Sequence, residues 1–180
     1  ENNQDVSISF HESFESDNSI PVDWEEDVIS GTARWNVIKI ILSSENKPAA
    51  ADGKSYARLE YSDTTLDFNK KNAVTKLITD NMLLSPNARY GIDMMVRTLP
   101  VSESAENILS LYYEKDGEWV LLKEYDITNH DEWQKFSAQI IGDGITRFAF
   151  EGNLSQYGSL LLDDIAVYLV DEPTSIYNSS

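Results

Sequence analysis

The chain has 180 residues, which suits a single domain with a hydrophobic core of its own. Its formal net charge of −17, from 31 acidic and 14 basic residues, opposes binding to nucleic acid phosphates and to anionic membrane surfaces. It has no cysteine, no apolar run of about 18 residues and no signal-peptide pattern at its N-terminus, so we expect no disulfide, no thiolate metal site and no membrane insertion of this chain.

β-Strands are predicted along the whole chain, because short runs that alternate apolar and polar residues follow one another between turn signals. The first run, 6–11, leads into a long acidic loop at 16–27, where Pro21 and several Asp and Asn residues argue against regular structure. The next run, 32–42, is rich in β-branched residues and is expected to be buried on both sides. The remaining predicted strands cover residues 55–61, 74–84, 89–98, 107–114, 118–125, 133–141 and the two halves of 145–169.

The fold class follows from this series of strands, since no stretch with helical periodicity competes with it. We predict an all-β fold, an antiparallel β-sandwich of the jelly-roll type. One such domain is expected over residues 1–170. The polar segment 171–180 contains a proline and is predicted to be a flexible C-terminal tail.

Two adjacent aspartates interrupt the last part of the chain, 145–169, which otherwise reads as the final hairpin of the sandwich. Because side chains alternate along a strand, Asp163 is predicted on the same side as Ile165 and Val167, and Asp164 on the opposite side. One carboxylate therefore points inward. A bound metal would compensate its charge, and an arginine or several backbone N–H groups are the alternative partners.

Short motifs follow one another in a characteristic order over most of the chain. They are Phe14-Glu15, Pro21, Trp24, Trp35, Asp52-Gly53-Lys54, Leu84-Ser85-Pro86, the hairpin 112–122, Glu132-Trp133-Gln134, Arg147-Phe148-Ala149-Phe150 and Leu162-Asp163-Asp164-Ile165. In this order the chain resembles the cleaved-adhesin or choice-of-anchor J domains of Bacteroidetes surface proteins. These are jelly rolls related to the MAM domain and to galactose-binding-like carbohydrate-binding modules. The chain departs from the family pattern in lacking the usual glycine just before Trp24.

The resemblance implies a structural Ca²⁺ that fastens the end of the first strand to the last strand. In the family pattern the glutamate of the Phe-Glu pair and the first aspartate of the Asp-Asp pair supply side-chain oxygens, which are here Glu15 and Asp163. Since Ca²⁺ takes six to eight oxygens, Asp17 is a further candidate ligand. The resemblance also implies a secreted, non-catalytic adhesion or interaction module on the bacterial cell surface. A cysteine preceding Glu1 in the precursor would make it a lipoprotein.

The sequence contains no catalytic pattern. The strand motif typical of jelly-roll glycosidases is absent, and so is the G-x-S-x-G motif of serine hydrolases. His11 and His130 have no partner at metal-ligand spacing in the sequence. We therefore predict that the chain is not an enzyme.

Carbohydrate binding is the alternative function, because exposed aromatic rings stack on the C–H faces of sugars. Trp24 in the acidic loop and Tyr157 in the last loop are the candidate ligand-binding residues. Tyr112, Tyr113, Trp119 and Trp133 complete the set of aromatics considered. Trp35 and Trp133 are predicted to be core residues, and Trp119 is predicted to pack across strands. Exposed aromatics along a groove would favour an extracellular glycan as partner, and a flat polar face would favour a surface protein.

Overall fold

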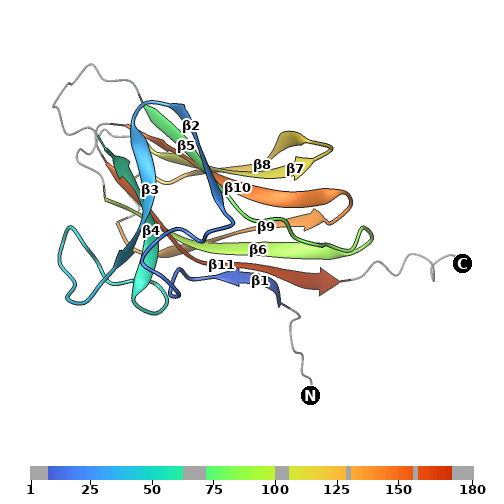
Figure 1. Cartoon of the computed structure of the whole chain (residues 1–180), viewed down its shortest axis with the longest axis horizontal. Coiled ribbons are helices and arrows are strands. Elements are labelled where there is room, and N and C mark those ends of the chain that lie inside the picture. Colours follow the sequence, from blue (N-terminus) through green and yellow to red (C-terminus); the bar gives the residue numbers. More distant parts are fainter. Residues whose placement is uncertain (1–7, 63–71, 100–105, 129–130, 156–157, 172–180) are drawn as a thin grey trace, which may run out of the picture.

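The computed structural model describes residues 8–62, 72–99, 106–128, 131–155 and 158–171, which form two antiparallel sheets packed face to face (Figure 1). One sheet has the order β3-β4-β11-β6-β9, with β1 also paired to β11, and the other has the order β2-β5-β10-β7-β8. The predicted all-β antiparallel sandwich is therefore confirmed. None of the described segments forms a helix that is long and apolar enough to cross a membrane.

The strands have the following bounds. They are β1 Ile8–Glu12, β2 Glu25–Ser30, β3 Ala33–Lys39, β4 Ser55–Tyr61, β5 Ala73–Ile78, β6 Arg89–Leu99, β7 Ile108–Lys115, β8 Glu118–Asp126, β9 Gln134–Ile141, β10 Ile145–Leu154 and β11 Ser159–Asp171. The predicted tail, 171–180, lies almost wholly outside the described residues.

The main hydrophobic core lies between the two sheets and includes the indole of Trp35, which is 3% exposed, as predicted. A smaller cluster of Ile40, Tyr56 and Leu161 forms separately. Trp133 packs against this smaller cluster, with its ring edge-on to Tyr56 and the ring centroids 5.7 Å apart. The prediction that Trp133 is a core residue within a strand is therefore wrong, because it precedes β9 and is only half-buried.

Two expectations about the N-terminal third are wrong. Strand β2 begins at Glu25, inside the segment predicted to be an irregular loop, and it pairs with β5 along five register positions. Strand β3 ends at Lys39 and buries only alternate residues, while Ile41 and Leu42 beyond it are about nine-tenths exposed. Strand β3 lies at the edge of its sheet and covers the core with one face, so it is not buried on both sides.

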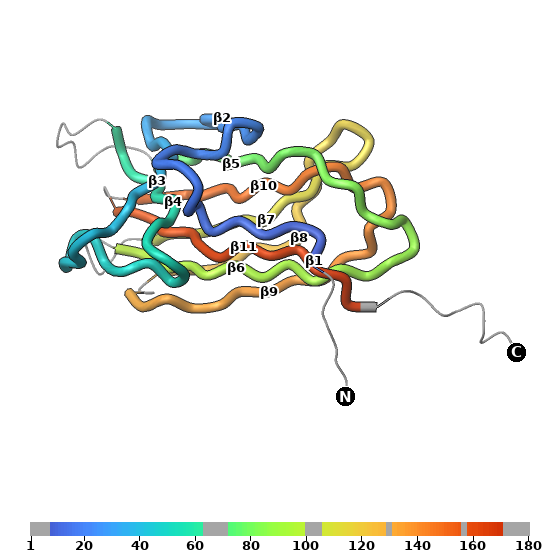
Figure 2. Tube along the Cα trace, turned by 60° about the horizontal axis from the view of Figure 1, so that its bottom comes forward, coloured from blue at the N-terminus to red at the C-terminus, as the bar shows by residue number. Residues whose placement is uncertain are grey.

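The last two strands do not form a hairpin, although residues 145–169 were expected to. Strand β10 pairs with β5 and β7 in one sheet, whereas β11 pairs with β4, β6 and β1 in the other. The chain therefore crosses from one layer of the sandwich to the other between them. As a result, β11 lies in the interior of its sheet, with the N-terminal strand β1 alongside it (Figure 2).

Candidate functional site

Strand β11 contains a β-bulge at the two adjacent aspartates. Its register with β6 shifts between Asp163 and Ala166, so Asp164 and Ile165 together oppose one residue, Met94. Asp164 has a φ of 48°, in the left-handed region that few residues other than glycine adopt. A bulge of this kind changes which face of the sheet the following side chains occupy.

The bulge corrects the predicted sides of this strand. Leu162, Ile165 and Val167 all belong to the core between the sheets. Asp163 alternates with Leu162 and therefore lies on the outer face with Leu161, which belongs to the smaller cluster. The prediction that Asp163 shares a side with Ile165 and Val167 is wrong, because strict alternation fails across a bulge.

Asp163 is nevertheless completely buried, with 0% exposure. On the side of β11 opposite β6, β4 pairs with residues 160–162 and β1 pairs with residues 165–168. The strand that pairs with this side of β11 thus changes from β4 to β1 at Asp163. The segments that follow β1 and precede β4 meet over this carboxylate and cover it.

The oxygens of Asp163 accept two backbone hydrogen bonds, from the N–H of Asp52 at 2.9 Å and from the N–H of Asp164 at 2.8 Å. Burial, together with the negative charges of Asp52 and Glu15, raises the pKa of Asp163 to about 7, although the two backbone hydrogen bonds oppose that rise. Among the described residues, no lysine or arginine forms an ion pair with Asp163. No cationic side chain in the described part of the chain therefore balances its charge.

Glu15 joins the segment after β1 to the start of β4. Its carboxylate accepts the N–H of Lys54 at 3.0 Å and the N–H of Ser55 at 2.8 Å. Gly53 makes this approach possible, because a Cβ there would lie 2.5 Å from Cδ of Glu15 and its φ is +65°. The Asp52-Gly53 turn is therefore shaped around the Glu15 carboxylate.

Two further contacts complete this region. The Ser13 hydroxyl donates to Oδ2 of Asp52 at 2.7 Å, and Nε2 of His11 lies 2.7 Å from Oδ1 of Asp164. One ligand atom each from His11, Asp52 and Asp164 lies within 4.8 Å of the others. The fold thus gives His11 the close acidic partners that its position in the sequence did not show.

We call Glu15, Asp52, Asp163 and Asp164 the carboxylate cluster. Its donors are carboxylate oxygens, which are the ligands that Ca²⁺ prefers, and Asp163 is a buried anion that lacks a cationic partner in the described part of the chain. Carboxylate oxygens suit a hard divalent cation, and among the described residues the ligand atoms that lie within 4.8 Å of one another are those of His11, Asp52 and Asp164. Asp17, predicted as a further ligand, is exposed and takes part in none of the contacts above.

A second feature lies on the outer face of the sheet β2-β5-β10-β7-β8. Lys76, which is 7% exposed, places Nζ 4.4 Å from the ring centroid of Tyr112 and 5.0 Å from that of Trp119. Cζ of Arg147 lies 5.4 Å from the Trp119 ring. Lys76 also pairs across strands with Glu151 of β10. We call these five residues the aromatic face.

Carboxylates surround the two cations of the aromatic face. Arg147 donates to both oxygens of Glu114, at 2.8 and 2.9 Å, and to Glu25 at 2.9 Å. These bonds lower the pKa of Glu114. Burial raises the pKa of Glu151, and the charge of Lys76 opposes that rise. Trp119 therefore packs across strands as predicted, against cationic side chains.

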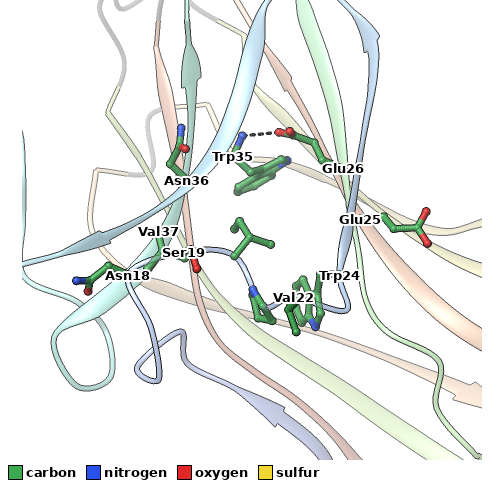
Figure 3. Close-up of a pocket in the computed structure, with 11 residues that line it drawn as sticks. Asn18, Ser19, Val22, Trp24, Glu25, Glu26, Trp35, Asn36 and Val37 are labelled. Atoms are coloured by element: carbon green, nitrogen blue, oxygen red, sulfur yellow. Dashed lines mark hydrogen bonds between the residues drawn. The ribbon is translucent and has the colours of Figure 1, made fainter.

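Trp24 lines an open pocket of about 420 Å³ between the acidic loop, β2 and β3 (Figure 3). Its indole is only 8% exposed and packs against Phe10 and Phe14, with ring centroids 5.9 and 5.7 Å away. Trp24 is therefore not the exposed stacking platform that the sequence suggested. The other candidate ligand-binding residue, Tyr157, lies outside the described residues.

No family model matches the sequence, and no curated protein matches it. The K1 cleaved adhesin domain of Lys-gingipain from Porphyromonas gingivalis W83 superposes with a TM-score of 0.64 at 17% identity, over 88% of this chain and 96% of that domain. The structure is a cleaved-adhesin-like jelly roll.

Carbohydrate-binding modules share this fold. The CBM22-1 xylan-binding domain of Paenibacillus barcinonensis Xyn10C has a TM-score of 0.59 at 14% identity and covers 96% of this chain and 100% of that domain. TmCBM61, whose structure contains β-1,4-galactotriose, has a TM-score of 0.57 at 17% identity, over 89% and 94% of the two chains. At these identities the likeness establishes the fold.

Sequence reasoning missed several residues of both features. Asp52 was part of a motif but was not predicted as a ligand, although its N–H donates to Asp163 and its charge acts on that carboxylate. Lys76 and Glu151 face each other across β5 and β10, which are far apart in the sequence. Only knowledge of which strands pair could have brought them together.

Proposed function

We propose that this chain is a non-catalytic adhesion or interaction module of the extracellular surface, stabilised by a calcium ion at the carboxylate cluster. The observation that carries the proposal is the buried, uncompensated charge of Asp163 within a cleaved-adhesin-like jelly roll. Two backbone N–H groups donate to Asp163, but its pKa is still raised, so a divalent cation would compensate the charge that these bonds leave.

The ligand side chains come from three separate segments. Asp163 belongs to β11, Glu15 follows β1, and Asp52 precedes β4. When bound, calcium supplies the positive charge that the cluster lacks. These residues then hold β1 and the start of β4 against the central strand of the sheet, which keeps the binding surfaces of the module in place.

A cell-surface location follows from the same proposal. Domains with this fold occur in the adhesin region of Lys-gingipain, and the partner proposed here is an extracellular glycan or a surface protein. The strong negative charge of the chain suits a soluble extracellular surface and divalent cations. A Bacteroidetes origin and a lipid anchor attached ahead of Glu1 remain predictions.

Thermal unfolding with and without a chelator tests the calcium proposal. At a calcium concentration one hundred times its dissociation constant, the ion is expected to stabilise the fold by about 2.7 kcal/mol. Chelator should lower the melting temperature, and excess Ca²⁺ should restore it. An unchanged melting temperature, together with no metal in elemental analysis of the purified protein, would contradict the proposal.

Carbohydrate binding is the second candidate function, and the aromatic face favours it. Tyr112 and Trp119 lie together with polar groups on an outer sheet surface, a combination that sugar sites use. The test is a glycan array probed with the calcium-loaded protein. Saturable binding to one sugar class supports this function. If the folded protein binds no glycan on the array, a surface protein is the better candidate partner. A release of reducing sugar would contradict the non-catalytic assignment.

A further inference from the structure

We propose that the aromatic face is the glycan site and that it selects an uncharged polysaccharide chain. The inference rests on the second candidate function and specifies its site and ligand class. It is carried by the position of the cations on the face, by the carboxylates beside them, and by a pocket that extends the face along the sheet.

Strand register orders the aromatic face into rows across the sheet. Lys76 pairs with Glu151, and Glu151 pairs with Ser110. In the next row Ala149 pairs with Tyr112. Ala149 is fully buried although its side chain lies on this outer face, because longer side chains on the neighbouring strands cover it. The centre of the face is therefore a packed surface with fixed side chains.

The cations of the face lie next to the rings. Lys76 contacts both Tyr112 and Trp119, and Arg147 contacts Trp119. Lys76 and Arg147 already form cation–π interactions with these rings. A cationic ligand that approaches either ring would therefore be repelled by a positive charge. A lysine-rich or arginine-rich partner is therefore disfavoured at this surface.

Carboxylates lie beside the cations, at the edge strands and on the central strand β10, and oppose anionic ligands. The acidic residues on this outer face are Glu25, Asp27, Glu114, Glu124, Asp126 and Glu151. Both cations already face carboxylates, since Arg147 is paired with Glu114 and Glu25, and Lys76 lies opposite Glu151. A uronic acid or sulfated sugar would meet an excess of negative charge, and Arg147, the arginine that the described residues place on this face, is already paired.

The face continues into a second pocket. This pocket, of about 330 Å³, is lined by Asn72, Glu106, Ile108, Glu124, Asp126 and Thr128. Glu124 connects the two regions, because it pairs with Ser110 and adds negative charge close to Tyr112 and Glu151. The combined surface is elongated, which suits several consecutive sugar units more than a single terminal sugar.

A neutral sugar chain matches both sets of groups. Its hydroxyls can donate to the carboxylates of this face, and a charge-assisted hydrogen bond of this kind is stronger than a neutral one. They can also accept from Lys76, while a C–H face packs against Trp119. A neutral sugar chain brings no charge of its own, so neither the carboxylates nor the cations of the aromatic face repel it.

The experiment measures binding of the calcium-loaded protein by isothermal titration calorimetry. The probes are xylan and a β-1,4-galactan as neutral chains, polygalacturonate and heparin as anionic chains, and polylysine as a cation. The variants are Trp119→Ala and Tyr112→Ala. Val120→Ala serves as the matched control, because it adjoins Trp119 in β8 and alternates to the other side of the strand. Thermal melts verify that each variant is folded.

The expected result is binding to a neutral chain that changes little between low and high salt. Each aromatic variant should weaken it about tenfold or more, which corresponds to about 1.4 kcal/mol, and Val120→Ala should leave it unchanged. If both aromatic variants still bind the neutral polysaccharide, the aromatic face is not the glycan site, although the protein does bind glycans. The proposed preference for uncharged polysaccharides would be wrong if the protein preferred an anionic chain. It would also be wrong if the wild type bound polylysine and the aromatic variants did not. Silence with every glycan would remove the second candidate function itself.

Discussion

Replacing Asp163 by asparagine is expected to have opposite effects with and without calcium. The pKa of Asp163 lies at about 7 in the folded protein, against an ordinary value of 3.8, because the carboxylate is buried near other carboxylates. Without metal, the folded state therefore holds the proton more tightly than the unfolded state. Stability falls as the pH rises from about 4 to about 7, and the full cost is present above that range.

The magnitude follows from the pKa difference. Each pKa unit corresponds to about 1.4 kcal/mol of free energy of unfolding. The ionised carboxylate of Asp163 therefore costs the metal-free fold about 4 kcal/mol at pH 8. Asparagine removes that charge, but its amide nitrogen must face one of the two backbone N–H groups that the carboxylate accepts, which costs about 1–3 kcal/mol. The metal-free variant should therefore be about 2 kcal/mol more stable than the wild type, a rise in melting temperature of about 4–8 °C.

Calcium should reverse this order. The wild type gains the binding free energy of the ion, whereas the variant lacks a charged ligand and gains little. The assay is differential scanning fluorimetry at pH 5 and pH 8, each with chelator and with excess Ca²⁺. The variant's advantage in chelator should shrink at pH 5, where Asp163 is mostly protonated. A variant that is less stable than the wild type in chelator at pH 8 would refute the reasoning.

Three further substitutions test other parts of the structure. Gly53→Ala should lower the free energy of unfolding by about 1–3 kcal/mol and weaken calcium binding. The added Cβ would lie 2.5 Å from Cδ of Glu15, at a backbone φ of +65°. An unchanged urea midpoint and calcium affinity would contradict this. Glu114→Gln should cost about 1–3 kcal/mol at pH 7 through its bonds to Arg147. Because those bonds lower the pKa of Glu114, the cost should vanish as the pH falls through that lowered value, which urea melts at a series of pH values below 7 measure. Trp24→Ala should cost about 3–5 kcal/mol by calorimetry, and a loss below about 1 kcal/mol would contradict its burial.

Much of the fold could be predicted because strands show a local signal. The alternation over residues 55–61, 89–98 and 107–125 gives strands close to their observed bounds. Strand β2 was missed because its sequence is acidic and follows a proline, and its pairing with β5 depends on a distant partner. The crossing between β10 and β11 was missed for a similar reason, since a short polar loop between two strands has the same pattern in a hairpin and in a connection between sheets.

The candidate site was only partly predictable. The burial of Asp163 followed from its position among apolar neighbours, but its side of the sheet did not, because a single bulge reverses the alternation and has no clear sequence signal here. Trp24 was predicted to be a candidate ligand-binding residue. It is buried because the loop folds back and packs the indole against Phe10 and Phe14. These outcomes depend on long-range contacts that local patterns do not contain.

The central claim is that the carboxylate cluster binds calcium and thereby stabilises a binding module, and calorimetric titration of the metal-free protein with Ca²⁺ tests it most directly. We predict one calcium ion per chain, bound through Glu15 and Asp163, so Glu15→Gln and Asp163→Asn should each abolish the binding heat. Asp17→Asn is the matched variant, and the exposed position of Asp17 predicts that it retains the site. Absence of calcium binding by folded wild-type protein, or equal binding by all three variants, would contradict the account.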